Sequence, residues 1–102
     1  MRTRLTFNLM LPEEKVIRAE SIDGGQAVVL HAARSLGAAR VAPCTLLFDS
    51  AGALVGVDVD PDGQRCVLML GGHEEVKGTQ ASEAKVDGST VRVSAGRALR
   101  LR

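Results

Sequence analysis

Two short turns of nearly identical design divide residues 43–71 into three extended segments. Asp49-Ser50-Ala51-Gly52 and Asp60-Pro61-Asp62-Gly63 begin eleven residues apart, each between runs rich in Val and Leu. An Asp that hydrogen-bonds its own turn, followed by a Gly where φ must be positive, favours a hairpin with a bulge. The segment therefore predicts a three-stranded antiparallel meander, and this confines the chain to β-rich folds.

Turn signals recur along the rest of the chain at intervals of about 8 to 14 residues, which is typical of all-β sandwiches and barrels. We therefore expect one all-β domain over residues 1–102, built as a small antiparallel barrel, sandwich or meander of short strands. The expected strands are 3–11, 15–22, 26–32, 40–49, 53–60, 64–70, 74–78, 84–87, 90–94 and 97–101.

Residues 26–37 allow a second interpretation. Apolar residues between Val28 and Leu36 recur at helical spacing in an Ala-rich stretch, and Gly37 could end a helix there. The β-branched pair Val28-Val29 favours a strand instead. We expect a strand followed by a loop, with an α+β fold containing one helix at about 26–37 as the alternative.

The composition excludes several classes of function. Phe7 and Phe48 are the only aromatic residues, so the chain offers few ring faces on which bases or sugars could stack. The net charge is only +1, and no apolar run approaches the roughly 18 residues that a membrane span needs. The apolar part of the N-terminal segment is short and interrupted by Asn8, unlike a signal peptide. We expect a cytoplasmic protein without membrane contact.

Counting outward from the two turns predicts which side chains of the meander share a face. If each turn has three loop residues, Asp49 lies opposite Ala53 and Asp60 opposite Gln64. One face then carries Thr45, Leu47, Val55, Val57, Val59, Val67 and Met69, and the other carries Cys44, Leu46, Phe48, Leu54, Gly56, Asp58, Cys66, Leu68 and Leu70. Both faces are apolar, so a covering layer or a second copy of the chain is expected over one of them.

This pattern leads to the first functional hypothesis. We expect a non-enzymatic interaction or scaffold module that self-associates, as a homodimer, through the apolar sheet of residues 44–70. The predicted self-association face consists of Leu47, Val55, Val57, Val67 and Met69. A different protein partner on the same sheet is also compatible with the pattern.

A basic C-terminal ribbon supports the alternative hypothesis. With Ser94-Ala95-Gly96 as a turn, Arg92, Arg100 and Arg102 fall on one outer face of a hairpin. Such a ribbon would bind an anionic partner, a nucleic acid or a nucleotide, in a regulatory domain. The near-zero net charge and the shortage of aromatic residues make this the less favoured reading.

The sequence offers little for catalysis or metal binding. The predicted register places Cys44 and Cys66 on either side of Asp58, about 10 Å apart and beyond disulfide reach, with no third soft ligand. The D-x-D-x-D-G run from Asp58 opens like a calcium loop, but Met69 stands where the bidentate Glu belongs. His73-Glu74-Glu75 lacks a second histidine. We therefore expect no enzyme activity, no metal and no cofactor.

Overall fold

A computed structural model describes residues 13–59, 66–70 and 76–101, with the side chains given from residue 16 onward. Seven strands lie in this part of the chain: β1 (Glu13–Ile22), β2 (Ala27–Ala32), β3 (Arg40–Phe48), β4 (Leu54–Val59), β5 (Cys66–Met69), β6 (Gly78–Asp87) and β7 (Thr90–Ser94). One turn of 3₁₀ helix, Asp23–Gly25, joins β1 to β2. The fold is all-β, which confirms the prediction of fold class.

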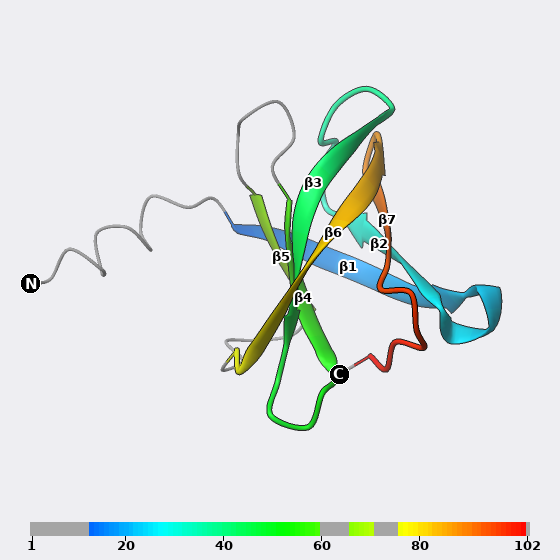
Figure 1. Ribbon diagram of the computed structural model, residues 1–102. Helices are drawn as coiled ribbons and strands as arrows, with labels where there is room; N and C mark the ends of the chain where they lie inside the picture. The colour runs from blue at the N-terminus through cyan, green and yellow to red at the C-terminus, as the bar shows by residue number, and fades with distance from the viewer. Residues whose placement is uncertain (1–12, 60–65, 71–75, 102) are drawn as a thin grey trace, which may run out of the picture.

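The seven strands curl into a barrel in the order β1-β2-β7-β6-β3-β4-β5 (Figure 1). All neighbours pair antiparallel except β1 and β5, which run parallel and close the barrel through only three residue pairs, from Glu13–Val67 to Lys15–Met69. Closure covers one face of the sheet without a helix, because the curled sheet encloses its own apolar side chains.

Residues 26–37 form a strand followed by a loop, as predicted. β2 covers Ala27–Ala32, and irregular backbone follows it to Ala39, so the helical alternative is wrong. β2 is buried between β1 and β7 in the sheet, where β-branched Val28 and Val29 fit a pleated surface.

The first predicted turn of the meander is confirmed in detail. The Asp49 backbone N–H donates to the Ala53 carbonyl at 3.0 Å, and Asp49 Oδ1 accepts from the backbone N–H groups of Ala51 and Ala53, each at 2.9 Å. Gly52 has φ +82°, as the turn requires. Asp49 is buried, so its carboxylate holds the turn from inside. The second turn, at residues 60–63, lies outside the described residues.

The predicted register is wrong by one residue along β4. Phe48 pairs with Leu54, as predicted from the turn, but Leu47 pairs with Gly56, so Val55 is an extra residue in β4. Beyond this bulge Leu46 pairs with Val57. A shift of one residue exchanges the two faces of a strand. Val57 and Val59 consequently point into the barrel, and Gly56 and Asp58 lie on the outer face.

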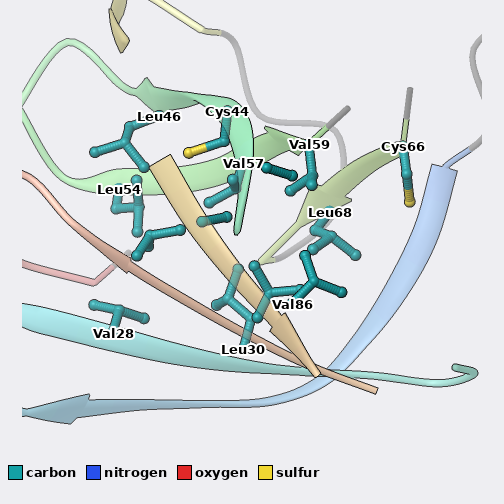
Figure 2. Close-up of a cluster of buried hydrophobic side chains, with 14 of the residues drawn as sticks. Val28, Leu30, Cys44, Leu46, Leu54, Val57, Val59, Cys66, Leu68 and Val86 are labelled. Atoms are coloured by element: carbon teal, nitrogen blue, oxygen red, sulfur yellow. The ribbon is translucent and has the colours of Figure 1, made fainter. Parts of the chain in front are cut away.

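The barrel interior is filled by aliphatic side chains from every strand. Figure 2 shows side chains of β3, β4 and β5 meeting those of β2 and β6 in one cluster. Its fully buried members include Val28, Leu30, Leu46, Leu54, Val57, Val59, Leu68, Val86, Val91 and Val93. Phe48 is the one aromatic residue in this cluster, in keeping with the aromatic-poor composition.

Two further expectations need correction. The predicted strand 84–87 is the end of a longer strand, β6, which begins at Gly78 and pairs along the whole of β3. Residues 74 and 75 of the predicted strand 74–78 lie outside the described residues. Residues 97–101 do not form a second arm of a β7 hairpin. They cross one end of the barrel, where the Leu99 N–H donates to the Gly25 carbonyl and the Leu54 N–H to the Arg100 carbonyl, both at 2.7 Å. The predicted strand 3–11 lies outside the described residues.

None of the helical structure among the described residues has the length and apolar character needed to cross a membrane.

Candidate functional site

The outer surface of β3, β4 and β5 is poor in charge. The register places Leu47, Gly56 and Met69 in one row across the three strands, and Thr45, Asp58 and Val67 in the next. Leu47, Val67 and Met69 are each half-buried. Apolar residues therefore lie on the outside of this sheet as well as in the core, as the two-sided pattern predicted.

Gly56 lets the apolar side chains close over β4. A Cβ atom built at Gly56 would lie 2.7 Å from Met69 Sδ and 2.9 Å from the Leu68 carbonyl oxygen. The Leu47 side chain approaches the same point, at 3.4 Å. Because no side chain stands between them, Leu47 and Met69 lean together across the central strand and present one continuous apolar surface.

β3 extends this surface toward the other end of the barrel. Val41 is 58% exposed and Pro43 is also exposed. We call Val41, Pro43, Leu47, Val67 and Met69 the apolar outer face. Val41 pairs with Lys85 and Pro43 with Glu83 of β6, so a positive and a negative side chain border the face on that side.

Only part of the predicted self-association face lies on this surface. Leu47, Val67 and Met69 are on it, whereas Val55 and Val57 have no exposed surface at all. Val57 belongs to the barrel core because of the bulge at Val55. The extra residue shifts the following residues of β4 by one position, so side chains predicted on the outer face point inward. Sequence reasoning missed Val41 and Pro43 because both lie outside the counted hairpins.

The outer surface of β1, β2 and β7 is charged, and its charges pair with one another. Glu20 Oε2 lies 2.9 Å from both Arg18 Nη2 and His31 Nε2. Arg92 Nη2 lies 2.5 Å from Asp23 Oδ2. A surface hollow of about 300 Å³ lies beside this second pair and is lined by Asp23, Gln26, Ala27, Glu83, Lys85, Arg92, Val93, Ser94 and Gly96. Its two acidic and two basic side chains leave no net charge for an anion to recognise.

The predicted basic ribbon is not assembled. Arg92 lies on β7 and is bound to Asp23, whereas Arg100 donates to the Ala51 carbonyl at the turn between β3 and β4. Arg102 lies outside the described residues. Arg97, in the same C-terminal segment, sits 5.1 Å from the centre of the Phe48 ring. The arginines thus serve different local contacts, because residues 97–101 do not return along β7.

The cysteines are buried thiols in the core. Cys44 and Cys66 both flank Val59, so the predicted row through Asp58 is wrong, again because of the bulge. Neither forms a disulfide. Burial raises the pKa of Cys44 to about 11, against a hydrogen bond from Ser82 that lowers it. A thiol with so high a pKa is a poor nucleophile at neutral pH.

No group of three or more potential metal ligands comes together within the described ranges 13–59, 66–70 and 76–101. His73-Glu74-Glu75 and most of the D-x-D-x-D-G run lie outside them. The chain matches no family model, no curated protein and no solved structure in sequence and structure comparisons. The function is therefore inferred from the geometry of the barrel.

Proposed function

We propose that the protein is a non-enzymatic interaction module that self-associates through the apolar outer face. The observation that carries this proposal is the row of Leu47, Gly56 and Met69 on the outside of a barrel whose interior is already filled. Val41 lies exposed at one end of this surface, and Leu47 and Met69 lie at the other. Burying such an apolar surface against a partner lowers the free energy, because water is excluded from it.

A second copy of the chain is the partner that suits this face. An isologous dimer places the same patch on both sides, so a patch that is mainly apolar is complementary to itself. Glu83 and Lys85, which border the face on β6, have opposite charges two residues apart. A two-fold axis running through the face can bring Glu83 of one copy to Lys85 of the other.

The charged surface supports a binding role over a catalytic one. Glu20 is paired with Arg18 and also contacts His31 on the open barrel surface, and Arg92 is held by Asp23. The same pairing weakens the alternative of an anionic partner, because Arg92 and Arg100 each have a local contact and lie on different elements. We place the protein in the cytoplasm, where two buried thiols such as Cys44 and Cys66 stay reduced.

Light scattering after size exclusion, over a series of protein concentrations, tests the proposal. The parent chain should approach twice the monomer mass at high micromolar concentration. Val41→Glu and Met69→Glu should have a lower mean mass than the parent chain at each high concentration, because each puts a charge into the apolar contact. Ala33→Glu is the matched control, since it adds the same charge at an exposed position just after β2, which β7 and β6 separate from β3, and it should associate normally. A monomeric parent chain contradicts the proposal.

The alternative function can be tested in the same preparation. Binding to a nucleic acid or a nucleotide through Arg92, Arg100 and Arg102 would fall steeply as salt is raised. We expect no binding that depends on these three arginines. Salt-sensitive binding that the triple change to Glu abolishes would replace self-association as the preferred function.

A further inference from the structure

β1 has an edge that the barrel leaves unpaired. β5 pairs with β1 only at Glu13–Lys15, whereas β2 pairs with it from Val16 to Ile22 on its other side. Along residues 16–22 the edge facing away from β2 has no strand partner and no backbone hydrogen bond within the part of the chain that the structure describes. Figure 1 shows β1 running past β5 toward the 3₁₀ turn. Unpaired backbone groups of this kind accept an added strand.

The side chains along this edge are also incompletely covered. No residue from Val16 to Ile22 is buried, whereas four of the six residues of neighbouring β2 are. Val16 and Ala19 pack against the core from one side only and remain half-buried, and Ile17 is 65% exposed. The edge thus combines open hydrogen-bonding groups with an apolar strip, which an extended segment could cover.

We propose that the edge of β1 at residues 16–22 binds the N-terminal segment 3–11 of a second copy of the chain. This segment alternates strictly, with Leu5, Phe7, Leu9 and Leu11 separated by Arg4, Thr6, Asn8 and Met10. Such alternation suits a strand with one buried face. Its nine residues are enough to cover the seven-residue edge, and its large apolar side chains would lie over Val16, Ala19 and Ile17.

The position of β5 requires the segment to come from another copy. Segment 3–11 leads directly into Glu13, and Glu13–Lys15 are paired with β5 on the same edge. To return antiparallel along residues 16–22, the segment of the same copy would have to displace β5. A parallel return needs a connection of about a dozen residues or more, and only Pro12 lies between Leu11 and β1. A segment from a second copy can pair with residues 16–22 without displacing β5 and without a connection to its own β1.

Two features keep this edge from pairing indiscriminately. Ile17 is an irregularity in the pairing of β1 with β2, and bulges disrupt the regular ladder that a passing strand would need. Arg18 and Glu20 also place opposite charges on the outer side of the edge. A segment with a positive residue such as Arg4 on its polar face can add a cross-strand contact to Glu20, which an arbitrary apolar strand cannot.

Hydrogen–deuterium exchange of the full chain at low and high protein concentration tests this exchange of segments. Peptides covering residues 3–11 and 16–22 should both exchange at least tenfold more slowly at high concentration. Phe7→Asp should abolish this protection in both peptides, and Asn8→Asp, which adds the same charge on the polar face of the segment, should retain it. Exchange of the β3 amides monitors folding of each variant, and Phe7→Ser is a second test without added charge.

The outcome is separable from that of the apolar outer face. Val41→Glu should remove dimerisation through that face and leave the concentration-dependent protection of residues 3–11 and 16–22 in place. Protection that is the same at all concentrations would show that the edge is covered within one copy, and would overturn the proposal. So would rapid exchange of residues 16–22 at every concentration, or protection that survives Phe7→Asp.

Discussion

The bulge at Val55 makes a sharp prediction about two valines that sequence alternation places on the same face. Val57 points into the barrel and is fully buried, whereas Val67 lies half-buried on the outer face. Replacing each by Thr changes the volume little and adds one hydroxyl. The two substitutions should therefore differ in their effect on the free energy of unfolding by an amount that reports only which way each side chain points.

The magnitude follows from burial. A hydroxyl placed in the core without a hydrogen-bond partner costs about 1–3 kcal/mol in proteins, and one buried methyl group worth about 0.8 kcal/mol is lost as well. Val57→Thr should thus lower the free energy of unfolding by about 2–3 kcal/mol. Val67→Thr can turn its hydroxyl to water and should cost less than about 0.5 kcal/mol, as is usual for surface changes.

Urea denaturation measures both effects. With a slope of about 1 kcal/mol per molar urea, typical of a small domain, Val57→Thr should lower the midpoint by about 2 M, and Val67→Thr should leave it nearly unchanged. The comparison should be made at a protein concentration at which the parent chain is monomeric, so that association does not contribute. Equal losses at the two positions would refute the register and with it the definition of the apolar outer face.

Three further substitutions or measurements probe other parts of the barrel. Gly56→Ala should destabilise the protein by about 1–3 kcal/mol in the same urea assay, because the new Cβ meets Met69 Sδ and a backbone oxygen at under 3 Å; an unchanged midpoint would show that β4 and β5 are not so close. Asp49→Ala should cost about 1–3 kcal/mol by leaving two turn N–H groups without their acceptor, and Asp49→Asn, which keeps that oxygen, should recover part of the loss. Because the pKa of Cys44 is raised from 9.0 to about 11, the unfolded chain loses this proton first, so stability should fall as pH rises from 9 toward 11 and fall less in Cys44→Ala; the same slope in both proteins would contradict the assignment.

Local chemistry explains what could be predicted of the fold. Asp49 and Gly52 specify a turn whatever surrounds them, and the turn has the predicted hydrogen bonds. Val28-Val29 carry a strand preference that the sheet environment reinforces, so the strand reading of residues 26–32 was confirmed. Short strands between such turns predict an all-β architecture, and residues 13–59, 66–70 and 76–101 contain no α-helix that could cover a sheet face.

The register of β4 could not be predicted because its two faces are equally apolar. Alternation determines register where one face is wet, but the run from Leu54 to Val57 gives no such contrast. The one sequence signal for the extra residue, Val55, is the neighbouring Gly56, because an isolated glycine inside a strand often marks a bulge or a close approach of backbone. The observed register of β4 depends on how Val57 and Val59 fill the barrel interior beside residues of other strands.

The prediction that Arg92 and Arg100 share one face of a hairpin is wrong for a different reason. Ser94-Ala95-Gly96 does change the direction of the chain, with φ +75° at Gly96, but the segment after it crosses the end of the barrel instead of pairing with β7. Both sides of β7 were already taken by β2 and β6. That competition is set by the whole topology, so the positions of Arg92 and Arg100 follow from the fold rather than from the hairpin-like sequence.

Intermolecular methyl contacts provide the most direct test of self-association through the apolar outer face. In a sample that mixes isotope-labelled and unlabelled chains, filtered nuclear Overhauser spectra record only contacts between copies. The account predicts such contacts among Val41, Leu47 and Met69, with none from the buried methyl groups of Val57. Contacts confined to other surfaces, or none at high micromolar concentration, would contradict it.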